Sequence, residues 1–391
     1  MKSFKLILPI IVFSQFCCTS LWFAGNSVIH DLILNFNLPA NALGHLTSAV
    51  QFGFIIGTLL FAILTIADRF SPSKVFFISA ILGSLFNFAV IYEANNLTSL
   101  LFLRFFTGFF LAGIYPVGMK IASDYYDKGL GKSLGFLVGA LVLGTAFPHL
   151  LKEITGTFPW KSVLIATSSL ALLGGLLMGF LVPNGPYCKP NLQTDLSVCF
   201  SVFKNKKFRS VAFGYFGHMW ELYAFWTFVP ILLKKYSTIH TVDYNIHVLS
   251  FIVIGIGGLA CIIAGYIAQR KGTQKIAFIA LLLSCICCLI SPLLFTIENE
   301  YFFIGFLLFW GMVVIADSPL LSTLVAQNAE PKIKGAALTI VNCIGFAITI
   351  ISIQIITKML EITDSNIIFI ILAIGPIFGL LLLKKKNTFK I

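Results

Sequence analysis

Twelve long apolar segments, separated by short polar gaps, make up most of this chain. A helix needs about 20 mostly apolar residues to cross about 30 Å of hydrocarbon, because it rises about 1.5 Å per residue. Each segment reaches about that length, so the pattern predicts an all-α membrane protein with twelve transmembrane helices. The predicted helices are 6–30, 43–67, 74–93, 98–121, 133–152, 161–182, 209–233, 247–268, 276–296, 301–324, 335–357 and 366–384.

The longest polar gap, residues 183–208, contains three prolines and then a group of lysines. It leaves six predicted helices on each side. We therefore predict an N-terminal six-helix bundle at 1–182, a cytoplasmic linker at 183–208 and a C-terminal six-helix bundle at 209–391.

Lysine and arginine predict the orientation, because they accumulate in the cytoplasmic loops of membrane proteins. Of the 27 such residues, 21 lie in the termini and alternate gaps on one side, five lie on the other side, and Arg104 lies within a helix. A missed or extra helix would invert every later loop and remove this asymmetry. We expect both termini in the cytoplasm, and a first segment that is a retained helix, not a cleaved signal peptide.

The composition fits a protein whose solvent is the bilayer. Hydrophobic residues make up 58% of the chain and charged residues 11%, with a mean hydropathy of +0.96, whereas a soluble domain needs more charge. The net charge of +12 is spread over short loops, so we expect no nucleic-acid partner. The nine cysteines lack metal-ligand spacing, so we expect no metal and no cofactor.

Three landmarks of the first half recur in the second half, displaced by 201, 203 and 204 positions. A nearly constant displacement indicates two parallel halves related by duplication. The paired landmarks are Asp68-Arg69 with Gln269-Arg270, Tyr115-Pro116 with Ser318-Pro319, and Gly131 with Gly335.

This arrangement resembles the major facilitator superfamily, whose secondary transporters have two parallel six-helix halves. Gly265, Arg270, Gly272 and Lys275 are similar to the family's loop motif G-x-x-x-D-R-x-G-R-R/K, with Gln269 at the acidic position. The resemblance covers essentially the whole chain. It implies two pseudo-symmetric six-helix bundles and transport by alternating access, in which the bundles rock around a site near the midplane.

The resemblance also suggests residues that control opening. In the family, the aspartate of the first-half loop holds the cytoplasmic ends of the halves together, and here it corresponds to Asp68. Proline removes a helical hydrogen bond, and interrupted helices at matching places in both halves point to a binding site. The gating candidates are Asp68, Arg69, Arg270, Pro116 and Pro319.

Ionisable residues inside predicted helices are the candidates for transport chemistry, because such groups normally face a water-filled cavity or a partner. His218 and Glu221 are three positions apart and so share a helix face. A carboxyl there can gain and lose a proton between transport states. We predict Glu221 and His218 as the proton-coupling site, with Asp317 as a second candidate. The structural alternatives are a hydrogen-bonded pair that fixes the helix, and an Asp317 that caps or packs.

Arg104 lies in a fragment similar to the family's helix-4 motif R-x-x-x-G, with Gly108 as its glycine. Its fork of donors can bind a substrate carboxylate or phosphate. The family resemblance instead favours a role in coupling or structure. Polar and aromatic residues of the predicted helices add candidates, although any single one is more often a packing or interfacial residue. The substrate-binding candidates are Arg104, Trp22, Asn26, Gln51, Tyr115, Trp220, Trp226, Trp310 and Asn342.

We therefore predict a monomeric, proton-coupled symporter of the cell inner membrane, not an enzyme, whose partners are a small solute, protons and lipid. Arg104 and the aromatic residues slightly favour a small organic anion or zwitterion. One alternative is a drug or metabolite efflux antiporter, which is weakened because Ala140 replaces the proline of the antiporter motif. The others are an uncoupled facilitator and, from another class, a transporter-like membrane sensor.

Overall fold

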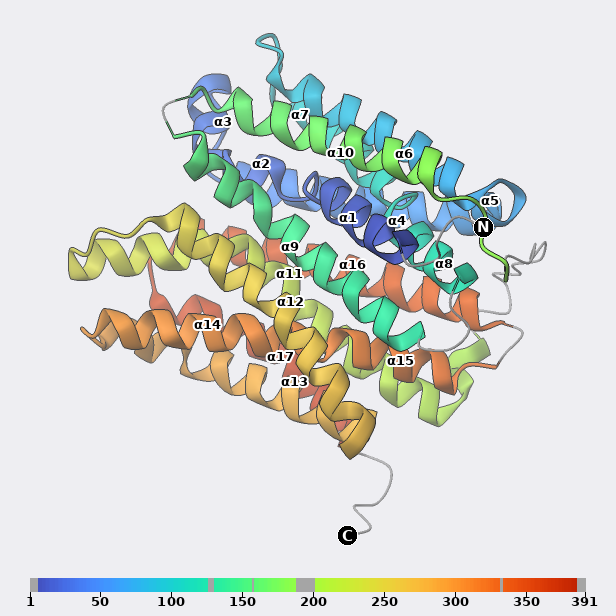
Figure 1. Ribbon diagram of the computed structural model, residues 1–391. Helices are drawn as coiled ribbons and strands as arrows, with labels where there is room; N and C mark the ends of the chain where they lie inside the picture. Colours follow the sequence, from blue (N-terminus) through green and yellow to red (C-terminus); the bar gives the residue numbers. More distant parts are fainter. Residues whose placement is uncertain (1–5, 126–129, 157, 188–200, 331–332, 385–391) are drawn as a thin grey trace. The chain divides into compact units, whose positions relative to one another are not determined.

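The secondary structure is helical throughout the described residues, which are 6–125, 130–156, 158–187, 201–330 and 333–384 of the computed structural model (Figure 1). The chain divides into two compact units. Unit 1 comprises Met1–Gln193 with Tyr244–Gly258, and unit 2 comprises Thr194–Asp243 with Leu259–Ile391. The domain boundaries expected from the sequence remain predictions.

Unit 1 contains the first six predicted crossings, several of which consist of two or three consecutive helices. The elements are α1 (Ile7–Thr19), α2 (Ala24–Ser27), α3 (Ile29–Phe36), α4 (Ala42–Ile63), α5 (Ile66–Arg69), α6 (Pro72–Phe88), η2 (Ala89–Ile91), α7 (Leu97–Leu111), α8 (Tyr115–Tyr125), α9 (Leu130–Ile154) and α10 (Lys161–Leu181).

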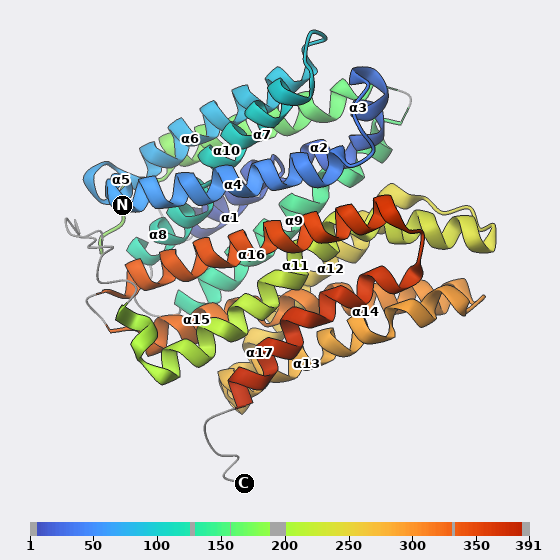
Figure 2. The same cartoon turned by 180° about the vertical axis from the view of Figure 1, so that it is seen from behind.

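Unit 2 contains the remaining crossings, apart from the first part of α12, which is grouped with unit 1. Figure 2 shows its helices from behind. The elements are α11 (Lys206–His240), α12 (Ile246–Lys271), α13 (Thr273–Ile290), η4 (Ser291–Thr296), α14 (Glu300–Ala316), α15 (Ser318–Asn328), α16 (Lys334–Ile362), η6 (Asn366–Ala373) and α17 (Ile374–Lys384).

Within the described residues, ten helical segments are long and apolar enough to cross a membrane. The first and seventh crossings differ from these ten. The first is divided among α1, α2 and α3, of which α1 has only 13 residues. The seventh crossing, α11, has 35 residues, whereas a helix needs about 20 to cross the membrane. It differs from the ten in composition, because its middle carries the ionisable residues His218 and Glu221. The protein is an all-α, multi-pass membrane protein, and twelve crossings fit its helices.

The first crossing is interrupted, whereas the sequence predicted one helix over 6–30. Helix α1 ends at Thr19 and α3 continues to Phe36. A broken helix exposes carbonyl groups that must find partners in a membrane. Arg104 of α7 supplies them, because its Nη2 donates to the carbonyl oxygens of Leu21 (3.1 Å) and Trp22 (2.6 Å).

Glycines allow α4 and α7 to pack at very short distance in unit 1. A Cβ added to Gly108 would overlap the carbonyl oxygen of Val50, and a Cβ added to Gly53 would overlap that of Phe105. Close backbone approach through small residues is a usual way for helices to associate in lipid, where the hydrophobic effect gives little drive.

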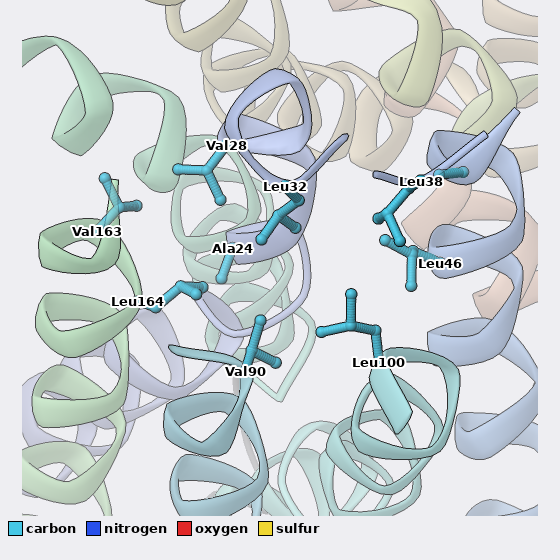
Figure 3. Close-up of a cluster of buried hydrophobic side chains, with 10 residues drawn as sticks. Ala24, Val28, Leu32, Leu38, Leu46, Val90, Leu100, Val163 and Leu164 are labelled. Carbon is cyan, nitrogen blue, oxygen red and sulfur yellow. The ribbon is translucent and has the colours of Figure 1, made fainter. Parts of the chain in front are cut away.

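At one end of unit 1, apolar side chains from several elements form a buried cluster (Figure 3). In this cluster, Val28 and Leu32 of the first crossing pack with Val90, Leu100 and two residues of α10, Val163 and Leu164. All of these side chains are fully or almost fully buried. The cluster consists of Ala24, Val28, Leu32, Leu38, Ala42, Leu46, Val90, Leu100, Val163 and Leu164.

Both expected proline interruptions are present. Helix α7 ends at Leu111, and α8 begins at Tyr115, next to Pro116. Helix α14 ends at Ala316, and α15 begins at Ser318, next to Pro319. The fourth and tenth crossings are therefore broken at matching places of the two halves.

Candidate functional site

The polar centre of unit 2 lies on α11 and on the break between α14 and α15. Pro319 has no N–H to donate to the carbonyl of Ile315 four residues earlier. That carbonyl instead accepts a hydrogen bond from Sγ of Cys261 at 3.4 Å. The break places Asp317 in the interior of unit 2, where its side chain is about 1% exposed.

His218 of α11 faces Asp317. Its Nδ1 lies 2.8 Å from Oδ1 of Asp317, and each side chain is 1% exposed. The distance is that of an ion pair, without the orientation of a hydrogen bond, so neither carboxylate oxygen accepts a well-directed hydrogen bond from the described residues. Nε2 of His218 also has no hydrogen-bond partner among them. The pair is therefore buried and incompletely satisfied.

Glu221 is held differently, although it is one turn from His218. Its Oε1 accepts hydrogen bonds from Oγ of Ser284 and from Nε1 of Trp310, the latter at 2.7 Å. Trp310 itself packs on Phe225, with 4.4 Å between ring centroids. Among the described residues, no hydrogen bond or ion pair joins Glu221 to His218. The two side chains share a helix face, as the spacing predicted, but their partners come from different helices.

Asn342 and Tyr215 lie beside the histidine. The Tyr215 hydroxyl donates to Oδ1 of Asn342 at 2.6 Å, and the Tyr215 and His218 rings are 5.9 Å apart. This contact connects α11 to α16 next to the His218–Asp317 pair.

The two other tryptophans of unit 2 are packing residues in this structure. Nε1 of Trp220 donates to the carbonyl oxygen of Ile371 at 2.9 Å, which fixes α11 to η6. Trp226 is fully buried and contacts the Tyr223 ring, with 5.2 Å between centroids.

Arg104 is buried among neutral oxygens in unit 1. Besides the two carbonyls of the broken first crossing, it donates from Nη1 to Oδ1 of Asn87 at 3.0 Å. Asn87 in turn donates to hydroxyls of α10, Ser168 at 2.9 Å and Thr167 at 3.1 Å. Arg104 thus connects three crossings of unit 1, and the three oxygens to which it donates are uncharged.

The candidates of the first and second crossings, Trp22, Asn26 and Gln51, have unequal surroundings. Nδ2 of Asn26 donates to Thr47 at 2.9 Å, and the Trp22 and Phe54 rings are 5.0 Å apart. Gln51 is completely buried, yet neither its Oε1 nor its Nε2 has a hydrogen-bond partner among the described residues. Burying an unpaired polar group costs about 1–3 kcal/mol.

Gln15 of α1 has surroundings like those of Gln51, although it is not among the candidates chosen from the sequence. It is completely buried, and neither polar atom of its carboxamide has a partner among the described residues. An amide side chain within an apolar segment is the sequence signal by which both Gln15 and Asn87 could have been selected.

Asp68, a gating candidate of the first half, lies in a polar cluster with Lys120 and Asp124. Nζ of Lys120 is 3.1 Å from Asp68 and 3.5 Å from Asp124, which ties α5 to α8 inside unit 1. Nε of Arg69 donates to Thr65 at 3.0 Å. The importance of Lys120 was not apparent from the sequence.

The remaining gating and binding candidates lie at helix ends and breaks. Tyr115 and Pro116 open α8 and are half-buried, and Pro319 lies in the first turn of α15. Arg270 is exposed near the end of α12, just before Gly272, whose φ of 92° turns the chain into α13.

No group of three His, Cys, Asp or Glu side chains within the described residues is arranged to hold a metal ion. The buried polar groups that the structure does show are an imidazole–carboxylate pair in unit 2 and carboxamides in unit 1, which can exchange protons and form hydrogen bonds.

Comparisons with known proteins agree with the fold. The family model of the major facilitator superfamily matches residues 11–353. A curated relative, the 4-hydroxybenzoate transporter PcaK of Pseudomonas aeruginosa, is 28% identical over 163 residues, which is 39% of this chain and 34% of that protein. The match therefore spans about a third of the relative's length.

Two solved structures are similar over nearly their whole length. A bacterial homologue of the human lysosomal transporter Spinster, in an inward-facing and unoccupied conformation, has a TM-score of 0.71 with 13% identity, covering 98% of each chain. The nucleoside transporter NupG has a TM-score of 0.74 with 16% identity, covering 97% of this chain and 99% of its own. At such identities the likeness shows the fold alone.

Proposed function

The chain belongs to the major facilitator superfamily, and we propose that it is a proton-coupled symporter that moves a small solute across the cell inner membrane by alternating access. The observation that carries this proposal is the contact of 2.8 Å between Nδ1 of His218 and Oδ1 of Asp317. Both side chains are buried in a membrane protein, where ionisable residues are costly and are functional by default.

A proton bound to this pair changes the charge in the interior of unit 2. Either member of the pair can carry that proton, because a neutral imidazole and a carboxylate are both proton acceptors. Protonation also changes the chemistry of His218 Nε2, which accepts a hydrogen bond in the neutral tautomer protonated at Nδ1 and donates one in the imidazolium. The proton thus alters what the site can bind, as coupling requires.

Glu221 belongs to the same proposal as a third ionisable group. Its carboxyl is one helical turn from His218, and Oε1 is fixed by Ser284 and Trp310. These two donors hold the carboxyl in one orientation, so a change in its protonation would be transmitted to α13 and α14.

For the substrate, we propose a small organic anion or zwitterion. The first support is the partial similarity to a 4-hydroxybenzoate transporter. The second is His218 Nε2, because the imidazolium would present a buried N–H to an anionic group. Arg104 contributes in another way, since its hydrogen bonds to the carbonyl oxygens of Leu21 and Trp22 stabilise the interrupted first crossing.

Uptake by proteoliposomes tests the proposal. The purified chain is reconstituted, an outside-acidic pH gradient is imposed, and a panel of labelled solutes is offered: 4-hydroxybenzoate, other small carboxylates, amino acids and nucleosides. We expect one or more carboxylates to accumulate above equilibrium, and a protonophore to abolish the accumulation. An uncoupled facilitator would reach only equilibrium, and an efflux antiporter would expel solute from vesicles with the opposite gradient.

Two variants locate the proton site. We expect Asp317→Asn and Glu221→Gln each to abolish accumulation above equilibrium while solute exchange across the membrane continues, because exchange needs no change in protonation. The matched control is Glu361→Gln, which removes an exposed carboxyl paired with Lys358, and it should accumulate solute normally. Full accumulation by Asp317→Asn would exclude the His218–Asp317 pair as the proton site. Full accumulation by Glu221→Gln alone would show that Glu221 has only a packing role.

A further inference from the structure

Two histidines that the proposed function does not use lie in unit 1. His149 of α9 is almost completely buried, and neither nitrogen of its ring has a hydrogen-bond partner among the described residues. His247, in the first turn of α12, is half-buried, and its Nδ1 also has no hydrogen-bond partner among them. A folded protein rarely leaves buried polar atoms unpaired without a reason.

Helix α9 packs closely against the first part of α12, which belongs to unit 1 as far as Gly258. A Cβ added to Gly258 would lie 3.3 Å from the carbonyl oxygen of Gly139. One added to Gly255 would lie 3.5 Å from Cδ2 of Leu143. Residue numbers thus rise along α9 as they fall along α12, so the two helices are antiparallel where they touch.

This antiparallel register brings the two imidazoles to the same level. His149 is ten residues after Gly139, and His247 is eleven residues before Gly258. Each separation is about three helical turns, so the two histidines follow the same contact toward the predicted outer side. A charge on His247 acts on His149, which agrees with this placement.

The charged side chains around this pair come from α3 and α9. Asp31, Lys152 and Glu153 act electrostatically on His247. Nζ of Lys152 is 2.8 Å from Asp31, so the Asp31 carboxylate is already paired. Glu153 is exposed, where water and salt screen its charge. These groups therefore give little compensation for positive charge on both histidines.

Protonation of both imidazoles would place two positive charges between α9 and α12. Burial of an ion without a counter-ion is costly, and like charges repel strongly where the dielectric constant is low. Neutral rings permit the contact, whereas charged rings favour a separation that admits water. Because the separated arrangement binds more protons, acidification favours it. An imidazole in water titrates near pH ~6.5, so the response should lie around that pH.

We propose that His149 and His247 form a second proton-binding site, at which proton uptake from the predicted outer side separates the first part of α12 from α9. Helix α12 continues beyond Gly258 into unit 2, so a change in its packing is carried along the helix. This site goes beyond the proposed function, because it lies in unit 1 and is distinct from the His218–Asp317 pair of unit 2.

Disulfide crosslinking of α9 to α12 tests the proposal in the ligand-free full chain. A Cβ added to Gly255 would lie 3.9 Å from Cβ of Ala146, and a disulfide needs about 3.5–4.5 Å between these atoms. The variant therefore carries Ala146→Cys and Gly255→Cys, together with Cys188→Ser and Cys199→Ser. Its rate of oxidative crosslinking is measured by mass spectrometry from about pH 7.5 to about pH 5.5.

The same four-fold variant with His149→Gln is the reference, because dividing by its rate at each pH cancels the pH dependence of the thiols. We expect the ratio to fall about tenfold over the pH unit below ~6.5, as one proton linked to separation implies. With His247→Gln in place of the parent, the ratio should not vary with pH, because repulsion needs both cations. His247→Gln serves as the reference if His149→Gln does not fold.

Two controls separate this site from other proton acceptors. His30→Gln removes an exposed imidazole of α3, and it should keep the fall in crosslinking. Asp317→Asn should keep it as well, because the proposed site does not include the His218–Asp317 pair.

Three results would overturn the second proton site: a ratio that does not change with pH, including no crosslinking at any pH; a fall that persists in His247→Gln; or a fall that either control removes. Since crosslinking needs neither substrate nor gradient, it is independent of transport. Failure of proton-driven uptake, together with a fall that His247→Gln removes, would refute the proposed coupling and leave this site standing.

Discussion

Arg104 shows how the surroundings decide the role of a charged side chain. The sequence places a permanent cation in an apolar helix, which allows either substrate binding or a structural task. Its partners are two carbonyls of the broken first crossing and Asn87, all uncharged. Asp317 is the contrasting case, because its oxygens lack well-directed donors among the described residues.

Arg104→Lys should destabilise the protein and not merely reduce transport. A lysine has one ammonium in place of a planar fork, so it cannot reach all three oxygens. We expect a loss of about 1.5–3 kcal/mol for each charge-assisted hydrogen bond that is not replaced, measured as a lower thermal unfolding temperature in detergent. Arg209→Lys, at an exposed position, is the control. Equal stability of the two variants would contradict the structural role.

At the scale of elements, helix breaks position the buried polar groups. In the tenth crossing, Pro319 frees the carbonyl of Ile315, and the break leaves Asp317 facing His218. In the first crossing no proline is present between Thr19 and Phe36, and the break is held by Arg104 from another helix. The sequence therefore predicted the first kind of interruption and missed the second.

Close packing between elements gives a second prediction. We expect Gly108→Ala to separate α4 from α7, because the added methyl overlaps the Val50 carbonyl. Overpacking of this kind costs about 1–3 kcal/mol or more, and the unfolding temperature should fall. Gly305→Ala is the control, since a Cβ there has no neighbour within 4 Å and the residue is exposed. A Gly108→Ala protein as stable as this control would disprove the close contact.

At the scale of the whole molecule, charge at the helix ends is distributed unevenly. The few lysines on the predicted outer side include Lys152, Lys161 and Lys358, and each is paired with a carboxylate: Asp31 at 2.8 Å, Glu93 at 2.8 Å and Glu361 at 2.7 Å. The hydrogen bond and charge of Lys161 lower the pKa of Glu93. Three of the five lysines on the predicted outer side are thus neutralised by a carboxylate.

Impermeant thiol reagents test the resulting topology in intact cells. In a variant with Cys188→Ser and Cys199→Ser, the other seven cysteines are buried. We expect a cysteine at Glu93 or Lys358 to be labelled from outside, and a cysteine at Lys206 or Lys275 only after permeabilisation. Labelling that does not alternate in this way would contradict the predicted order or orientation of the crossings.

The all-helical membrane fold can be predicted from the amino-acid sequence alone. Its apolar segments must satisfy their backbone hydrogen bonds internally in lipid, which makes them helices. Segment length, the duplicated landmarks and the lysine distribution then predict twelve helices in two parallel halves, and the resemblance of the loop motif at Gly265, Arg270, Gly272 and Lys275 adds the major facilitator family. The ionisable residues His218, Glu221, Asp317 and Arg104 were also visible, because charge is rare in an apolar segment.

The partners of those residues become visible only in the folded chain. Helical spacing places His218 and Glu221 on one face, but their partners Asp317, Ser284 and Trp310 come from helices more than 60 positions later in the chain. Likewise, whether a buried amide is satisfied, as in Asn87, or left unpaired, as in Gln15 and Gln51, depends on neighbours that no local pattern specifies. Hydrophobic length is a property of one segment, whereas hydrogen-bond satisfaction is a property of contacts between segments.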